Sequence, residues 1–216
     1  MALSVLYDDK YLIAINKEKG ISVIPGRGEN NGPPLVKIVE QSINCKLYVV
    51  HRLDKETSGV ILFAKDSSTH RQLSIQFEKK QIKKQYFAIV MGRPESEGII
   101  DSPIYEFGSG RMGVDKRGKQ SLTEFKVEEI FSKTCLLIVY PATGRRHQIR
   151  VHLYSKGFPV LGDNVYGNPR PVGGVSRLML HAQQICFTHP DGQLKTISAP
   201  VNEEWNEVLL QVRQAE

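Results

Sequence analysis

Short β-type runs separated by turns dominate the sequence, and they do not alternate regularly with helical segments. The run LTEFKVEEIF (122–131) alternates apolar and polar positions, as expected of an antiparallel strand with one buried face. This pattern predicts an α+β fold with a mixed, largely antiparallel central sheet flanked by helices and loops, rather than a doubly wound parallel sheet. Further strand-type runs are SVLYDD, YLIAINK, KLYVV, GVILFAK, QYFAIVMG, TCLLIVYP, RLMLHAQQICFTHP and QLKTISAP.

Helical signals are confined to fewer segments. SSTHRQLSIQFEKKQI (67–82) begins with capping residues and places Leu73 and Phe77 on one face. RRHQIRVHLYSKGFP (145–159) ends at Gly157, a residue type that commonly follows a helix. Further helix candidates are PPLVKIVEQSI (33–43) and the tail NEEWNEVLLQVRQ (202–214), whose Trp205, Leu209 and Val212 are expected to pack onto the domain.

The chain has the length and continuity of a single domain. Its 216 residues suffice to bury a sizeable core, and they contain no long linker and no internal repeat. The N-terminus, MALSVLYDDKY, lacks the basic region of a signal peptide, and the longest apolar runs are too short to span a bilayer. We therefore expect a cytoplasmic protein that does not bind membranes, and nothing in the sequence demands more than a monomer.

The overall charge is moderately basic. Lysine and arginine number 29 against 23 aspartate and glutamate residues, which gives a net charge of +6. This excess is compatible with a polyanionic partner but does not identify one. Cys45, Cys135 and Cys186 lie far apart and form no CxxC pair, so we expect small buried thiols in a reducing compartment rather than disulfides or a zinc site.

The segment VVHRLDKETSGVILFAKD (49–66) places a polar cluster between two strand-type runs. His51, Arg52 and Asp54 occur where the first run ends, and Thr57 follows them. An aspartate at the end of a buried strand, beside an arginine and small hydroxyl residues, can be held ionised and oriented. From this loop alone, a polar turn with local hydrogen bonds is the favoured interpretation.

Two basic clusters follow along the chain. One combines an aromatic residue, Tyr86, with preceding lysines, and this combination suits a phosphate backbone with a stacked base. By itself, a solvated helix end before a core strand is the favoured interpretation. The other, GRMGVDKRGKQSLTEF (110–125), contains Lys119 and is expected either to grip phosphates or to form a flexible surface hairpin. The lysines before Tyr86 are Lys79, Lys80, Lys83 and Lys84.

The segment YPATGRRHQIRVHLYSKG carries an arginine in the middle of a helix candidate. If the helix begins at about Arg146, then Ile149 and Leu153 face the core. His147 and Arg150 then share a different stripe of the helix. An arginine on that stripe could pair with a carboxylate and hold the pKa of the carboxyl group low.

Motifs of several other protein classes are absent. The sequence contains no P-loop, no GxGxxG fingerprint and no GxSxG elbow, which argues against nucleotide cofactors and serine hydrolases. His147 and His152 are five positions apart rather than four, so a metal-dependent hydrolase is a remote alternative. We expect neither a cofactor nor a metal ion.

Taken together and in this order, the clusters resemble the RluA-type pseudouridine synthases. HRLDKETSG is similar to the catalytic loop of that family, KKQYFAIVMG to its tyrosine strand and PATGRRHQIRVH to its arginine motif. VDKRGKQSLTEF, VLGDNVYG and RLMLHA also resemble family segments, so the likeness runs from about Val5 to Pro200.

The resemblance implies a pseudouridine synthase fold with an active-site cleft across the sheet. It implies isomerisation of uridine in ribosomal or transfer RNA, with base flipping and without a cofactor. It also implies that Asp54 is the catalytic aspartate, that Tyr86 packs against the target base, and that Arg150 pairs with Asp54. Arg52 is expected to help occupy the space left by the flipped nucleotide. The RNA contacts expected from these clusters are His51, Arg52, Thr57, Lys79, Lys80, Lys83, Lys84, Lys119, Arg145, Arg146 and His147.

Two features depart from the family pattern. Glu18 stands where the family's Asn-Lys-Pro-x-Gly segment has proline, and we expect this change to loosen a turn. Many relatives carry an extra N-terminal RNA-binding domain, whereas residues 1–216 are expected to form one catalytic domain without it. The alternative function is a catalytically silent RNA-binding protein on the same fold, and the intact Asp54, Tyr86 and Arg150 count against it.

Overall fold

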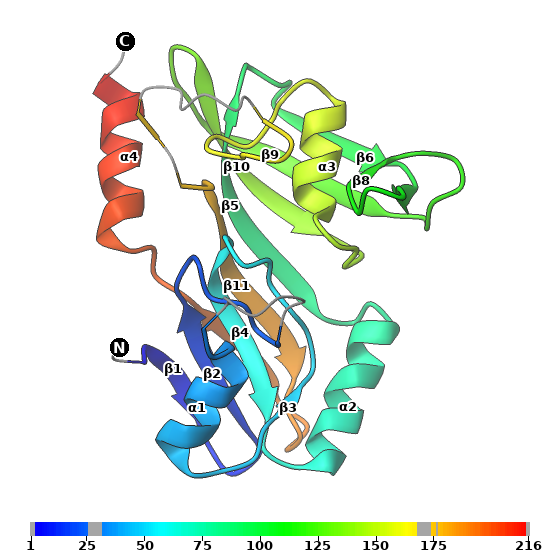
Figure 1. Cartoon of the computed structure of the whole chain (residues 1–216), viewed down its shortest axis with the longest axis vertical. Helices are drawn as coiled ribbons and strands as arrows, with labels where there is room; N and C mark the ends of the chain where they lie inside the picture. The colour runs from blue at the N-terminus through cyan, green and yellow to red at the C-terminus, as the bar shows by residue number, and fades with distance from the viewer. Residues whose placement is uncertain (1–2, 26–31, 168–173, 176, 215–216) are drawn as a thin grey trace. The chain divides into compact units, whose positions relative to one another are not determined.

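The computed structural model describes residues 3–25, 32–167, 174–175 and 177–214. The chain forms two compact units, each made of two separate stretches of sequence. Unit 1 consists of Met1–Lys84 and Ala182–Pro200, and unit 2 consists of Gln85–His181 and Val201–Glu216. The chain passes from one unit to the other within the strands β5 and β11 and again after Pro200 (Figure 1).

Unit 1 contains an antiparallel sheet with the strand order β1-β2-β4-β11. β12 pairs with β11, and the short β3 pairs with β4. Every residue of β4 is buried, which explains why its sequence is an almost continuous apolar run. The strands are β1 (Val5–Asp8), β2 (Leu12–Lys17), β3 (Tyr48–Val49), β4 (Ser58–Ala64), β11 (Leu180–Thr188) and β12 (Leu194–Ser198).

Two helices complete unit 1, and both confirm sequence predictions. α1 spans Leu35–Ile43 and α2 spans Ser67–Glu78. α2 begins where the carboxylate of Asp66 accepts hydrogen bonds from the backbone N and the Oγ1 of Thr69, at 2.8 and 2.7 Å. Leu73 of α2 is fully buried in the core, as its spacing predicts.

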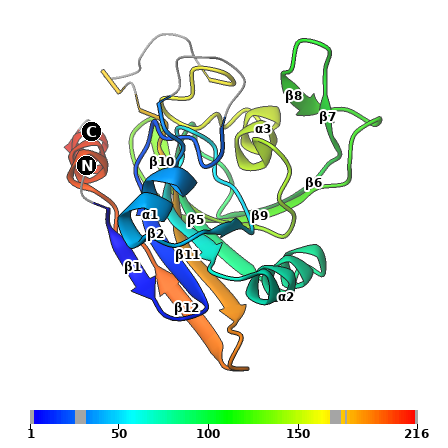
Figure 2. The same ribbon diagram turned by 60° about the horizontal axis from the view of Figure 1, so that its bottom comes forward.

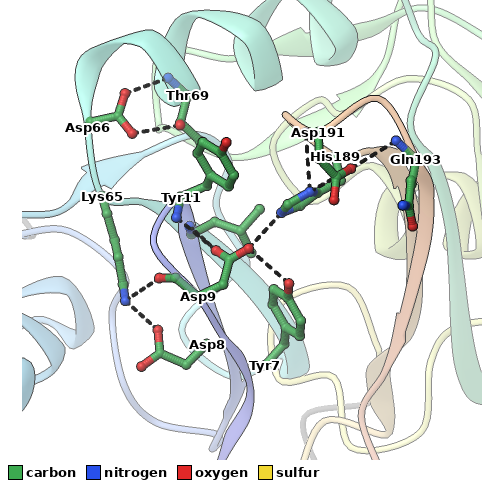
Figure 3. A network of polar contacts seen from close by, with 11 residues as sticks. Tyr7, Asp8, Asp9, Tyr11, Lys65, Asp66, Thr69, His189, Asp191 and Gln193 are labelled. Carbon is green, nitrogen blue, oxygen red and sulfur yellow. Dashed lines mark hydrogen bonds and ion pairs between the residues drawn. The ribbon is translucent and has the colours of Figure 1, made fainter.

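A buried histidine joins the β1–β2 turn to the β11–β12 hairpin. Nε2 of His189 lies 2.8 Å from Oδ2 of Asp9, and Nδ1 lies 2.9 Å from Oδ1 of Asp191 (Figure 3). The carboxylate of Asp9 also accepts hydrogen bonds from the hydroxyl of Tyr7 and from two backbone amides, including that of Tyr11. This polar network fastens together two turns that are distant in sequence.

Unit 2 contains an antiparallel sheet with the order β5-β10-β9-β6 and a separate β7–β8 hairpin (Figure 2). β9 confirms the predicted alternation, because Thr123 and Phe125 are buried while Glu124 and Lys126 are exposed. The strands are β5 (Lys83–Met91), β6 (Glu97–Asp101), β7 (Ile104–Glu106), β8 (Met112–Val114), β9 (Leu122–Ile130) and β10 (Thr134–Pro141).

Two helices also belong to unit 2. α3 spans Gln148–Ser155, and α4 spans Glu203–Gln214. Trp205 of α4 is 2% exposed within the core of this unit, which confirms the predicted packing of the tail. The centroid of the Trp205 ring lies 5.5 Å from Cζ of Arg177 and 5.8 Å from the ring centroid of His181.

The α+β class and the largely antiparallel sheet are confirmed, while some details differ from expectation. α3 begins at Gln148 rather than at about Arg146. His147 has a left-handed backbone (φ 55°), so the helix cannot extend toward the N-terminus beyond Gln148. The short strands β6, β7 and β8 carried no clear sequence pattern. Cys135 is buried, but Cys45 and Cys186 are only half-buried, so the prediction of buried thiols is correct for one of the three.

None of the helices in the described part of the chain is long and apolar enough to cross a membrane.

Candidate active site

The loop that carries Asp54 joins β3 to β4 in unit 1. Val49 pairs with Phe63 just before the loop, and β4 begins at Ser58 just after it, so strand pairing fixes both ends. Within the loop, the backbone N of Thr57 donates to the carbonyl of Asp54 at 3.1 Å and closes a turn. Thr57 is buried, Asp54 is half-buried, and the preceding Arg52 is exposed.

His51 anchors the start of this loop. Its Nε2 accepts a hydrogen bond from the backbone N of Leu62 at 3.0 Å, and its ring stacks on Phe77 of α2 at 4.8 Å. Burial, with a smaller effect from the charge of Lys84, lowers the pKa of His51 to about 3. The ring is therefore neutral at physiological pH, with its proton on Nδ1. The RNA contact predicted for His51 stays a prediction.

Lys17, at the end of β2, supports the loop from the buried side. Its Nζ donates to the carbonyls of Glu18, Ile21 and Lys55, each at 2.9 Å. Burial lowers the pKa of Lys17 to about 8, although the negative charges of Glu56 and Asp54 act in the opposite direction. Lys17 therefore fixes the residue next to Asp54 and supplies a positive charge near the carboxylate.

The HRLDKETSG segment ends in Gly59, at a position that requires glycine. Its backbone has φ +114°, a conformation that side chains disfavour. A Cβ at this position would lie 2.2 Å from the carbonyl oxygen of Ala182 in β11. Glycine therefore allows β4 to approach β11 directly after the loop.

Tyr86 and Arg150, the other two predicted catalytic residues, belong to unit 2. Tyr86 lies in β5, pairs with Val139 of β10, and is half-buried against the core of this unit. Arg150 lies in α3 and is buried, with 6% of its surface exposed. Ile149 and Leu153 of the same helix are buried as predicted.

Asp163 holds the guanidinium of Arg150. Nε of Arg150 donates to Oδ2 of Asp163 and Nη2 donates to Oδ1, both at 2.8 Å. Burial raises the pKa of Asp163, but the hydrogen bonds and charge of Arg150, with the amides of Tyr166 and Val165, outweigh it and leave this pKa below its ordinary value. Because Asp163 occupies the Nε and Nη2 edge, the Nη1 edge points away from it.

A glycine and a tyrosine complete the surroundings of this ion pair. Gly162 has φ +74°, and a Cβ there would lie 1.8 Å from the carbonyl oxygen of Arg177, so only glycine fits before Asp163. The Arg150 guanidinium lies 5.1 Å from the ring centroid of the buried Tyr166. The Tyr166 hydroxyl lies 2.7 Å from Nδ1 of His147, which fixes the residue before α3.

Gln148 orders the arginine-rich loop before α3. Its Oε1 accepts hydrogen bonds from Oγ1 of Thr143 and from the backbone N of Arg145, at 2.6 and 3.0 Å. Its Nε2 donates to the carbonyl of Leu122 and to Oγ1 of Thr123, both at 2.9 Å. The buried amide therefore ties residues 143–147 to β9.

The predicted catalytic residues are divided between the two units. Unit 1 holds His51, Arg52, Asp54 and Thr57 on a single loop, and unit 2 holds Tyr86 and the arginine-rich motif. Because Asp54 and Arg150 belong to different units, their predicted pairing stays a prediction.

The predicted basic contacts differ in exposure and pairing. Arg146 donates to Glu106 at 2.8 Å, so part of its charge is already balanced. Lys84 is half-buried, and burial lowers its pKa to about 8. The remaining predicted lysine and arginine contacts outside the Asp54 loop are exposed: Lys79, Lys80, Lys83, Lys119 and Arg145.

Sequence reasoning missed Lys17, Asp163 and Gln148. A lysine closing the apolar run of β2 was a usable signal, because a charged group in a buried strand must find partners. The segment VLGDNVYG drew attention to Asp163, but no spacing rule links it to Arg150. Gln148 carried no signal, since its four hydrogen bonds depend on tertiary structure.

The described residues contain no group of three or more histidine, cysteine, aspartate or glutamate residues placed to hold a metal ion. Both ring nitrogens of the buried His152 are engaged within the protein. Nδ1 lies 2.9 Å from Oγ1 of Thr123, and Nε2 lies 3.0 Å from the carbonyl oxygen of Ser102.

Comparison with known proteins gives a consistent family. Residues 11–155 match the family described as RNA pseudouridylate synthase. The dual-specificity RNA pseudouridine synthase RluA of Escherichia coli K12 is 36% identical over 93% of this chain and 94% of its own length. The tRNA pseudouridine synthase C of Pasteurella multocida is 36% identical over 97% of this chain and 96% of its own.

A longer relative and a solved structure agree with this assignment. The ribosomal large subunit pseudouridine synthase D of Nitrosomonas europaea is 36% identical over 98% of this chain, which spans only 65% of that relative. The structure of human RNA Pseudouridylate Synthase Domain Containing 4 matches with a TM-score of 0.79 and 26% identity, over 97% of this chain and 93% of that one. The chain therefore belongs to the RNA pseudouridylate synthase family.

Proposed function

We propose that the protein is an RNA pseudouridine synthase that isomerises uridine in ribosomal or transfer RNA. The observation that carries this proposal is the rigid loop around Asp54. His51, Lys17 and the Thr57 turn fix its backbone at three places, which leaves a half-buried carboxylate on a preorganised support. The relatives include a ribosomal large subunit pseudouridine synthase and a tRNA pseudouridine synthase, which supports both classes of substrate.

The chemistry of the reaction fits a site built from side chains alone. Conversion of uridine to pseudouridine breaks an N–C glycosidic bond and forms a C–C bond, with no net oxidation or reduction. The target base must first leave its stack, at a cost of a few kcal/mol that protein contacts must offset. Ionised Asp54 then attacks the ribose, takes a proton from the sugar, or attacks the uracil ring.

Each of the remaining residues has a proposed part in this sequence. Tyr86 packs against the target base and serves in the removal of the proton at C5. Arg150 supports the charge of Asp54, and Arg52 occupies the space that the flipped nucleotide leaves. We propose that both units act as one catalytic domain, because the family match at residues 11–155 runs through both of them. We also propose that the protein is a cytoplasmic monomer.

Two measurements test the proposal. The purified chain is incubated with cellular RNA labelled with tritium at uridine C5, and pseudouridine formation is expected to release the label. Pseudouridines are also mapped in total RNA from cells with and without the gene, and loss of at least one site in ribosomal or transfer RNA is expected. Unchanged maps together with no tritium release would contradict the proposed function.

A further inference from the structure

The turn that follows β8 holds an exposed arginine in one orientation. Oδ1 of Asp115 accepts hydrogen bonds from both the backbone N and the Nε of Arg117, and Oδ2 accepts one from Nη2, all at 2.9 Å. The backbone N of Gly118 donates to the carbonyl of Asp115 at 2.9 Å and closes the turn. Reciprocal bonds between Lys119 and Ile104 attach the turn to β7. The guanidinium is therefore ordered before any ligand arrives.

One face of this guanidinium rests on aromatic rings. Cζ of Arg117 lies 4.4 Å from the ring centroid of Tyr105 and 5.9 Å from that of Phe107. The two rings meet edge to face at 5.3 Å, which fixes the surface beneath the arginine. The Arg117 side chain is 63% exposed, so much of the guanidinium surface that the rings and Asp115 leave uncovered is in solvent.

This geometry favours a base over a phosphate as the ligand. Arginine binds phosphate through the fork edge of its guanidinium, and here Asp115 already occupies the Nε and Nη2 edge. The same carboxylate balances the charge that would attract a phosphate. The planar face is not used by Asp115, and guanidinium planes stack well on the faces of unpaired nucleobases.

We propose that the exposed face of Arg117 is a stacking site for an unpaired RNA base other than the target uridine. The proposal rests on the proposed function only in taking RNA as the ligand. Lys116 and Lys119, both exposed on the same turn, supply positive charge for the neighbouring phosphates. Because Asp115 and Tyr105 already order Arg117, stacking costs little further side-chain entropy.

Binding to two matched probes tests this site. Fluorescence anisotropy measures the affinity of the full chain for a labelled single-stranded oligoadenylate and for an oligomer of the same length with abasic riboses. Arg117→Ala and Arg117→Lys are both expected to weaken oligoadenylate binding by roughly three- to tenfold. Binding of the abasic oligomer and the salt dependence of binding should not change. Lysine keeps the charge but lacks the planar face, so it should not rescue binding.

Arg213→Ala is the matched control. Arg213 forms a bidentate pair with Glu129 and is also exposed, but the described residues place no aromatic ring beneath it. Its replacement should leave oligoadenylate binding unchanged. Thermal unfolding of each variant confirms that the fold is intact.

Two results would overturn the stacking site. Rescue by Arg117→Lys, or a salt slope that falls by about 0.7 in Arg117→Ala, would assign Arg117 to a phosphate. Equal oligoadenylate binding by wild type and Arg117→Ala would exclude any contact with bases. Tritium release, assayed in parallel with the wild-type chain, separates the two proposals. If no tritium is released but the Arg117 variants lose binding only to the oligomer with bases, the proposed enzyme activity is contradicted and the stacking site is supported.

Discussion

The guanidinium of Arg150 and the carboxylate of Asp163 form a buried pair joined by two hydrogen bonds of 2.8 Å. Such a pair fixes the plane of the guanidinium, because two parallel bonds allow only one orientation. It also makes each partner depend on the other, since either one alone would be an uncompensated buried charge.

Asp163→Asn is expected to weaken both stability and turnover. The free energy of unfolding should fall by about 3 kcal/mol, because Arg150 keeps its charge but loses its counter-charge. Urea denaturation measures the stability, and tritium release measures the turnover. In the double variant Arg150→Met/Asp163→Leu, stability should largely return while turnover does not, since apolar side chains can replace a buried ion pair. Recovery of turnover in that variant would exclude a role for the pair in catalysis.

Asp54→Asn should bind RNA with wild-type affinity and salt dependence but release no tritium from RNA labelled at uridine C5. The amide preserves shape but removes the negative charge that either attack or proton removal requires. Glu56→Gln, in the same loop and exposed, is the matched control and should remain active. Retained tritium release by Asp54→Asn would remove Asp54 from the mechanism.

Arg150→Ala should lose turnover far more than RNA affinity. The Arg150 side chain is buried and held by Asp163. This position does not suit a contact with an RNA phosphate, but it suits the support of a carboxylate. Single-turnover rates and equilibrium binding are measured on the same RNA. Equal losses in both would indicate that Arg150 contacts a phosphate instead.

His51 predicts a pH dependence of stability. Its folded-state pKa of about 3 lies below the ordinary value of 6.5, so the unfolded chain takes up the proton first as the pH falls. The stabilisation is therefore complete above pH 6.5 and is lost as the pH falls toward 3, with a slope of up to about 1.4 kcal/mol per pH unit. In His51→Gln this slope, measured by urea denaturation between these pH values, should be smaller.

The free energy of unfolding of the wild type and of His51→Gln, compared at pH 7.5, is the control for this prediction. Both side chains are neutral there, and the glutamine Oε1 can accept the bond from the backbone N of Leu62. An unchanged slope in acid would show that His51 does not titrate with unfolding.

Asp9→Ala should lower the free energy of unfolding by about 2 kcal/mol or more, because it removes the acceptor shared by His189, Tyr7 and two backbone amides. Burial raises the pKa of Asp9, but these hydrogen bonds leave it below its ordinary value, so the stabilisation is present at neutral pH and lost in acid. Asp8→Ala is the matched control: it removes only a surface ion pair with Lys65 and should cost less than about 1 kcal/mol. Equal effects would contradict the role assigned to Asp9.

The sequence predicted the elements whose pattern is long and local. The alternation of β9, the almost continuous apolar run of β4 and the start of α2 at its capping residues each follow from neighbouring residues. The predicted start of α3 was wrong, because the left-handed His147 is held by Tyr166, nineteen positions away along the chain. β7 and β8 have three residues each, too few for a period to appear.

Some residues of the candidate site could be predicted from the sequence, and others could not. Asp54, Tyr86 and Arg150 came from motif resemblance, whereas the groups that hold them are revealed only by three-dimensional contacts. Lys17 reaches the carbonyl of Lys55, 38 positions away, and Asp163 reaches Arg150, 13 positions away. No local sequence pattern predicts these contacts, since they depend on the tertiary structure.

The close contact of Gly59 with Ala182 has a consequence for protein synthesis. Asp54 is translated in the first third of the chain, but the strand that packs against the end of its loop is completed only at Thr188, and β12 only at Ser198. A nascent chain therefore carries the loop for much of its time on the ribosome with β2 and β3 available to β4 but without β11. Ribosome-bound intermediates that lack β11 should accordingly lack protection of the β4 amides on the β11 side of the strand.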